Sequence, residues 1–163
     1  MTFPPPSRSR RRFVAGALLL AVPLAAPAQL LPKAFDPARD AAKDLEAAQS
    51  IARSSGRRVL VDVGGEWCTW CHVMVRFFAG NEGMRRLRDR NYVWVKVNYS
   101  KDSPNQKVLS RWPKVAGYPH LFVLDADGRL LHSQDTSALE AGKDYDTSAF
   151  REFLVKWASD APR

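Results

Sequence analysis

The chain has 163 residues, which is enough for one globular domain and too few for two of ordinary size. It is 45% hydrophobic and 26% charged, the composition of an ordinary globular protein. The formal net charge is +8, but half of it comes from four arginines within the first 28 residues. The remaining 21 basic and 17 acidic residues form no basic stripe with interleaved aromatic residues, so nucleic acid is not expected as a partner.

The first 28 residues have the pattern of a secretory signal peptide. An arginine-rich start is followed by a short apolar run, Phe13 to Val22, and by Ala26-Pro27-Ala28, which matches an A-x-A cleavage site. Because the run is too short to cross a bilayer comfortably, we expect a cleaved signal, a periplasmic protein and no stable membrane insertion after cleavage. An uncleaved anchor is the alternative. Ser9-Arg10-Arg11-Arg12-Phe13 also resembles the twin-arginine signal, so the export route stays open between that pathway and general secretion.

A helix and a strand are predicted ahead of the cysteines. Asp36-Pro37 is typical of an N-cap followed by proline at the first helical position, and apolar residues at helical spacing extend this helix to Gly56. Arg58–Val63 is predicted as a buried strand, and Gly64 to Trp67 turns the chain. The apolar stretch Val73–Phe78 then indicates the start of a packed helix.

The second half alternates between the same two patterns. Further helices are expected over Asn81–Arg90, from Ser103-Pro104 to about Trp112-Pro113, and over Thr147–Ser159. Strands are expected over Tyr92–Val97, Leu121–Leu124 and Arg129–Ser133, and 139–146 is expected to be a polar loop. A solvated helix face is predicted for the arginines at Arg85, Arg86, Arg88 and Arg90. The first two strands, joined by a helical crossover, should be parallel and the last two an antiparallel hairpin, which gives an α/β fold.

The two cysteines of the chain stand together in Cys68-Thr69-Trp70-Cys71. Two intervening residues let both sulfurs share one turn, and there is no third cysteine with which either could pair. A strand that runs into this motif at a helix N-terminus places Cys68 where a thiolate is stabilised, with Cys71 one turn further as the resolving thiol. A static structural disulfide is the alternative, but so short a loop would stabilise the fold only weakly.

Three separate segments carry motifs of one family. Val59 to Cys71 contains an apolar strand, an aspartate, a turn and Glu-Trp-Cys-x-x-Cys; Ala116-Gly117-Tyr118-Pro119 precedes the predicted strand at Leu121; and Asp127-Gly128 forms a tight turn. These segments resemble the active-site strand, the cis-proline loop and the hairpin of the thioredoxin family. The resemblance implies a thioredoxin-like fold, a central mixed β-sheet flanked by helices, over 58–160, after a signal peptide at 1–28 and an N-terminal helical segment at 29–57.

Trp70-Cys71-His72-Val73-Met74 further resembles a branch that includes the spermatogenesis-associated thioredoxin-domain proteins, which are much longer. Two positions depart from thioredoxin. Thr69-Trp70 replaces Gly-Pro between the cysteines, and His120 follows the proline where threonine is usual. Both departures leave the redox potential and the choice of partner open.

The resemblance implies roles for two residues beneath the cysteines. Asp62 is expected to lie under the dithiol and to accept a proton from Cys71 during exchange. A strand-end aspartate that meets water or caps the turn is the alternative. Lys96 matches a buried lysine near that aspartate, or it is an exposed strand lysine.

The remaining site residues are expected on the substrate side. By resemblance, Pro119 has a cis bond to Tyr118 and lies within van der Waals reach of the Cys68 sulfur. Lacking an N–H, Pro119 leaves neighbouring backbone groups free to pair with an extended substrate strand. Trp67 and Trp70 are expected to wall the site.

The resulting hypothesis is an exported thiol-disulfide oxidoreductase that exchanges disulfides with protein substrates through Cys68 and Cys71. It needs no dissociable cofactor and works with an unidentified redox donor or acceptor protein. The reducing direction is expected because the strong-oxidase form of the motif has histidine immediately before the second cysteine. Trp70 stands there in this chain and brings no charge.

Two other functions use the same cysteines. Cys68 to His72 satisfies Cys-x-x-Cys-His, the attachment motif of c-type haem. That site needs no apolar strand or aspartate ahead of it, and Met74 and Met84 both lie too close for the usual axial methionine. A copper or zinc site would combine the cysteines with a histidine, but His72, His120 and His132 are scattered along the chain.

Overall fold

A four-stranded mixed sheet lies at the centre of the computed structural model, which describes Met1 and residues 30–159. The strands are β1 (Arg58–Gly64), β2 (Tyr92–Asn98), β3 (His120–Leu124) and β4 (Leu130–Asp135). Their order is β2-β1-β3-β4, with β1 parallel to β2 and antiparallel to β3, and β3 antiparallel to β4. The predicted α/β class, the parallel first pair and the antiparallel last hairpin are confirmed.

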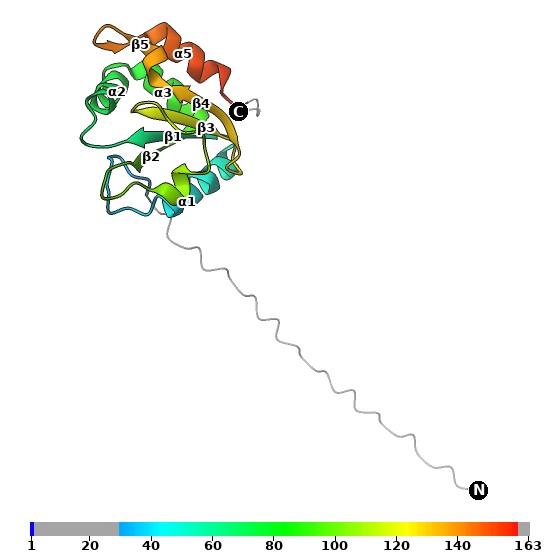
Figure 1. Ribbon diagram of the computed structural model, residues 1–163. Helices are drawn as coiled ribbons and strands as arrows, with labels where there is room; N and C mark the ends of the chain where they lie inside the picture. Colours follow the sequence, from blue (N-terminus) through cyan, green and yellow to red (C-terminus); the bar gives the residue numbers. More distant parts are fainter. Residues whose placement is uncertain (2–29, 160–163) are drawn as a thin grey trace.

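Helices cover both faces of the sheet (Figure 1). They are α1 (Ala41–Ser55), α2 (Thr69–Gly80), α3 (Glu82–Asn91), α4 (Gln106–Leu109) and α5 (Thr147–Lys156). One face packs against α1 and α4, and the other against α2, α3 and α5. A 3-10 turn, Thr136–Leu139, and a small hairpin of β5 (Glu140–Ala141) and β6 (Asp144–Tyr145) connect β4 to α5.

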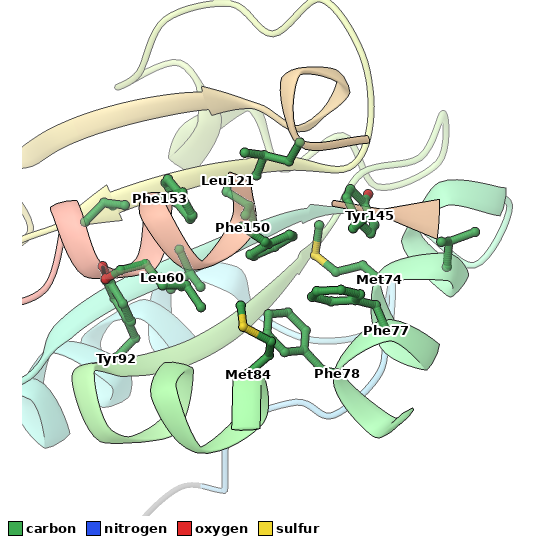
Figure 2. Packing of buried hydrophobic residues seen from close by; sticks show 14 residues of the cluster. Leu60, Met74, Phe77, Phe78, Met84, Tyr92, Leu121, Tyr145, Phe150 and Phe153 are labelled. Carbon is green, nitrogen blue, oxygen red and sulfur yellow. Dashed lines mark hydrogen bonds between the residues drawn. The ribbon is translucent and has the colours of Figure 1, made fainter. Parts of the chain in front are cut away.

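Side-chain alternation along β1 divides the core into two clusters. Val59, Val61 and Val63 pack with α1 on one face. Leu60 points to the other face, among the aromatic rings of α2 and α5 that Figure 2 shows. Asp62 and Gly64 share the Leu60 face by the same two-residue period, so β1 presents an acid and a glycine on the side where α2 begins.

The predicted start of the first helix at Asp36-Pro37 is wrong. The N-cap of α1 is Asp40, whose side chain accepts hydrogen bonds from the backbone N–H groups of Ala42 and Lys43. Asp36 closes a separate turn by accepting from the N–H of Ala38 at 2.8 Å. Both Asp36 and Asp40 are residues that can cap a helix, but the run of helix-forming residues is unbroken only after Asp40.

The predicted helix after Ser103-Pro104 shrinks to the single turn of α4. Asn105 precedes α4 in the left-handed region, at φ 47°. Its side-chain amide donates to the backbone carbonyl of Asn98 at 2.7 Å. This hydrogen bond holds the chain against the end of β2, so helical geometry does not begin at Ser103.

The expected polar loop at 139–146 contains the β5–β6 hairpin, which turns at Gly142 with φ 64°. Tyr145 on β6 is 4% exposed. Its ring lies 5.8 Å from that of Phe77 and 5.3 Å from that of Phe150, between centroids. Strands of two residues are too short to show alternation, so only the tertiary contact reveals them.

One arginine of the expected solvated face of α3 is buried. The guanidinium carbon of Arg88 lies 4.4 Å from the ring centroid of Phe78 and 3.9 Å from that of Trp94, and the side chain pairs with Asp89 at 2.7 Å. Burial lowers the pKa of Arg88 from its usual value. The aromatic faces and the carboxylate offset the cost of desolvation, which the helix sequence by itself does not show.

Within residues 30–159, no helix has both the length and the apolar character needed to cross a membrane. The predicted signal peptide lies, apart from Met1, outside the described residues.

Candidate active site

The two cysteines form a disulfide at the start of α2, with their Cα atoms 5.2 Å apart. Cys68 is the N-cap of α2, as the sequence predicts, and its sulfur accepts a hydrogen bond from the backbone N–H of Cys71 at 3.1 Å. The unpaired amides and the dipole at this end of the helix favour negative charge. The Cys68 sulfur therefore lies where a thiolate is stabilised once the disulfide is reduced.

A buried ion pair occupies the sheet on the same face as Leu60. The parallel register of β1 and β2 places Asp62 beside Lys96, and Lys96 Nζ donates to Asp62 Oδ2 at 2.9 Å. The residues are only 1% and 5% exposed. The second oxygen, Asp62 Oδ1, has no hydrogen-bond partner among the described residues. The alternatives of a water-exposed aspartate and an exposed lysine are both wrong.

Gly64 lets the resolving sulfur approach the strand. A Cβ atom on Gly64 would lie 2.4 Å from Cys71 Sγ and 3.1 Å from Phe35 Cζ. Phe35, from the segment before α1, forms one cluster with Cys68 and Cys71. The sequence prediction missed Phe35, because it placed a helix start next to it. An isolated aromatic residue ahead of an Asp-Pro turn was the only available signal.

The rings of Trp67, Tyr99 and Tyr118 lie together beside the disulfide, on the side here called the outer side. The Tyr118–Pro119 bond is cis, as predicted, and Tyr118 packs against the disulfide cluster. The Tyr118 ring stacks on Tyr99 with centroids 4.7 Å apart and meets the edge of Trp67 at 5.6 Å. Burial, and next a hydrogen bond with Tyr99, raise the pKa of Tyr118 to about 12. Trp67 is 58% exposed and donates through Nε1 to the Tyr99 carbonyl at 2.8 Å.

Trp70 lies on the other side of the cysteines and packs against the hairpin. Its ring lies 5.4 Å from that of Tyr145, edge to face, and Tyr145 Oη donates to the Trp70 carbonyl at 3.5 Å. Tyr145 was missed by the sequence prediction because it falls within the expected polar loop. The structure thus brings Trp67, Trp70 and Tyr118 around the disulfide, with Trp70 on the hairpin side.

A pocket of about 470 Å³ opens beside Tyr118, on the side of the sheet that α4 covers. Its walls are largely apolar and aromatic and include Tyr99, Trp112 and Phe122, with Lys114 at its edge. Tyr99 and Tyr118 belong both to this pocket and to the aromatic group beside the disulfide, so the two regions are continuous.

Each of the three histidines has a different hydrogen-bond partner. His72 is held by the backbone carbonyl of Glu66, 2.7 Å from its Nε2; His120 pairs with Ser133; and His132 pairs with Gln134. Within residues 30–159 no three His, Cys, Asp or Glu side chains come close enough together to hold a metal ion. Met74 and Met84, the methionines weighed as haem ligands, are buried in the core that Figure 2 shows.

Comparison with known proteins agrees with this geometry. A family model described as thioredoxin-like matches residues 40–126, more than half of the chain. The chain belongs to the thioredoxin-like family. The matched range includes α1 and the first three strands of the sheet. The family resemblance and the thioredoxin-like fold expected from the motifs are thereby confirmed.

Two curated relatives are thiol:disulfide interchange proteins DsbD. The one from Klebsiella pneumoniae is 28% identical over 110 residues, which are 67% of this chain and 17% of that protein. The one from Pseudomonas fluorescens is 28% identical over 115 residues, which are 70% of this chain and 18% of that protein. The chain therefore matches less than a fifth of the length of these relatives.

Solved structures share the fold. The disulphide isomerase of Xylella fastidiosa superposes with a TM-score of 0.65 at 20% identity, covering 78% of this chain and 96% of that one. The oxidised C-terminal domain of Neisseria meningitidis DsbD gives a TM-score of 0.55 at 19% identity, covering 72% and 96%. A DsbH oxidoreductase gives 0.52 at 19% identity, covering 87% and 95%.

The first prediction concerns Gly64. Gly64→Ala should lower the free energy of unfolding of the oxidised protein by about 1–3 kcal/mol, because the added methyl group collides with the Cys71 sulfur and the Phe35 ring. Gly83→Ala is the matched control: its Cβ would meet only Asn81 Oδ1, at 3.6 Å, and alanine favours the helix. Urea unfolding measures both variants. Equal stabilities would contradict the close approach of sulfur and strand.

The second prediction concerns the loss of stability at low pH. Burial lowers the pKa of His120 below its ordinary value of 6.5, against the opposing charge of Asp135, and His132 adds to the lowering. The unfolded chain then binds a proton that the folded chain resists, so stability falls as the pH drops below about 6.5. Thermal unfolding between pH 7.5 and 5 should show a smaller loss in His120→Gln than in the parent chain. Identical pH profiles would contradict the burial of a neutral His120.

Proposed function

We propose that this protein is an exported thiol-disulfide oxidoreductase that reduces disulfides in other proteins. One observation carries the proposal: the Cys68–Cys71 disulfide caps helix α2 and lies on the same face of the sheet as the buried Asp62–Lys96 pair. A structural disulfide needs neither a helix N-terminus nor a buried acid on that face. The names of the DsbD relatives, which are thiol:disulfide interchange proteins, support the same chemistry.

The exchange follows from the two sulfurs. In the reduced protein the Cys68 thiolate attacks one sulfur of a substrate disulfide, and the other substrate sulfur leaves as a thiolate that takes up a proton. The Cys71 thiol then loses its proton and attacks the Cys68 sulfur. The Cys68–Cys71 bond forms, the mixed disulfide breaks, and the second substrate sulfur leaves as a thiolate that takes up a proton from water. Two electrons and two protons pass to the substrate.

Asp62 is proposed as the acceptor of the Cys71 proton. Its Oδ2 accepts a hydrogen bond from Lys96, whereas Oδ1 has no hydrogen-bond partner within residues 30–159 and has lone pairs available for a proton. A carboxylate in a water-poor site is a competent general base for a thiol. The positive charge of Lys96 compensates the negative charge of Asp62 before Asp62 accepts that proton.

The outer side of the disulfide is proposed to receive the substrate chain. Pro119 has no N–H, so an extended substrate segment can pair with neighbouring backbone groups there. Trp67 offers an exposed aromatic face beside Tyr118. The adjoining pocket with Trp112 in its wall is large enough for an apolar side chain of the substrate.

The reducing direction is supported by the residues next to the sulfurs. Trp70 precedes the second cysteine, and its ring packs edge to face against the ring of Tyr145. The His72 ring is bonded to the Glu66 carbonyl, 2.7 Å away. Trp70 brings no charge next to the second cysteine, where the oxidase form of the motif has histidine, so the reduced form lacks that extra stabilisation.

We also propose that the chain is exported to the periplasm by the signal expected at 1–28. An oxidising compartment supplies disulfides as substrates and requires a separate source of electrons. That source is a redox donor protein. The DsbD relatives are several times longer than the matched region, so their own partners are not transferred to this chain.

The third prediction tests the order of the cysteines. Cys71→Ser should accumulate mixed disulfides with substrate proteins, because the Cys68 adduct is no longer resolved, and Cys68→Ser should not. Non-reducing electrophoresis after acid quenching in periplasmic extract measures the adducts. The unaltered chain should reduce insulin, and both variants should lose that turnover. Equal trapping by both variants, or no insulin reduction by the parent, would overturn the proposed function.

The fourth prediction concerns the redox potential, which sets the direction of electron transfer. Equilibration with glutathione buffers should give a potential nearer to about −270 mV, the value of thioredoxin, than to about −120 mV, the value of the periplasmic oxidase. Trp70→His should move the potential in the positive direction, because an imidazolium next to the resolving cysteine stabilises the thiolate. A potential above roughly −150 mV in the parent chain would place it with the oxidases.

A further inference from the structure

The segment before α1 contributes a side chain that the exchange steps above do not use. Phe35 is 4% exposed and packs in one cluster with Cys68 and Cys71. Its backbone N–H donates to Glu66 Oε1 at 3.0 Å, which ties it to the turn ahead of Cys68. Phe35 is therefore held at the site through both its ring and its backbone.

The Phe35 ring contacts both the cluster of the two cysteines and the lysine of the buried ion pair. On one side, Lys96 Nζ is 4.0 Å from the ring centroid and 2.9 Å from Asp62 Oδ2. On the other side, the ring edge and Cys71 Sγ flank the same point above Gly64, at 3.1 Å and 2.4 Å from the position a Cβ would take. The ring thus occupies space over Gly64 next to both the sulfur and the lysine.

We propose that Phe35 is a positioning residue for the exchange. Its ring keeps water from the side of the dithiol that Phe35 covers, here called the inner side, so that the Cys71 proton leaves only through Asp62. The inference rests on the proposed function for its role in catalysis. A thiolate against an apolar ring is disfavoured, so Cys71 stays a neutral thiol until Asp62 takes its proton. Without the ring, solvent would replace Asp62 as the proton acceptor.

Charged and titratable groups surround this space on every element packed against it. They are Asp62 on β1, Lys96 on β2, Glu66 in the turn, His72 on α2, Asp44 on α1, Asp36 and Arg39 in the segment before α1, Tyr118 ahead of β3 and Tyr145 on β6. Asp62 is paired with Lys96, and Arg39 with Asp44. Phe35 carries no charge, so its removal leaves these groups in place and acts on Cys71 chiefly by admitting water.

The test titrates Cys71 on its own. In a Cys68→Ser background, the ultraviolet absorbance of the thiolate is followed against pH, and the chain with Cys71 also replaced by serine supplies the tyrosine background. Phe35→Ala should lower the Cys71 midpoint by about one pH unit or more, a tenfold change in acidity, toward the ordinary cysteine value of about 8.5. Phe35→Leu keeps apolar bulk and should lower it by a smaller, measurable amount.

Phe153 provides the matched control. It is 5% exposed, as buried as Phe35, and belongs to the core cluster of α5 rather than to that of the cysteines. Phe153→Leu should lower the thermal stability and leave the Cys71 midpoint unchanged. A purely structural Phe35 would behave in the same way.

An unchanged midpoint in the Phe35 variants, or an equal shift in Phe153→Leu, overturns the proposal. If Phe35→Ala does not fold, Phe35→Leu decides by the same criterion. The titration needs no turnover, so it distinguishes the two proposals. Failure of the chain to reduce insulin would contradict the proposed function. The midpoint of the Cys71 titration tests the role of Phe35 whether or not insulin is reduced.

Discussion

The buried ion pair of Asp62 and Lys96 is the interaction on which the site depends. The parallel register of β1 and β2 sets the two residues side by side, and both are almost fully withdrawn from water. Desolvation of each ion costs several kcal/mol, which their attraction offsets only while both partners stay in place. Such a pair adds little net stability, and loss of one partner costs about 3–5 kcal/mol. Its position on the face where α2 begins therefore accords with proton transfer better than with stabilisation.

A dry environment for this pair has to be assembled from distant parts of the chain. Phe35 comes from the segment before α1, Trp94 from β2, and the cysteines from the start of α2. The Lys96 ammonium lies against both aromatic faces, which replace part of its lost hydration. Gly64 allows these groups to converge, because any side chain there would occupy the position of the Cys71 sulfur.

The two sides of the disulfide differ in a way that divides the proposed work. The inner side is closed by Phe35 and faces the ion pair. The outer side carries the half-open aromatic group of Trp67, Tyr99 and Tyr118 and continues into the pocket under α4. In the proposed exchange, a substrate that approaches from the outer side leaves the inner side undisturbed.

The sequence by itself determined the class of fold and the position of the cysteine pair. Period-two alternation and apolar runs are local properties, as are a cysteine pair spaced for one turn and a Gly-Tyr-Pro motif before a strand. The register that joins Asp62 to Lys96 was open from the sequence, because an exposed lysine fits the same strand pattern. The burial of Phe35, Tyr145 and Arg88 could not be predicted from their local sequence, since each is buried by contacts between different elements of the fold. The sequence by itself determined the cysteine pair and its place before a helix, and only the tertiary structure decided which residues bury it, because burial depends on packing between segments that no local pattern connects.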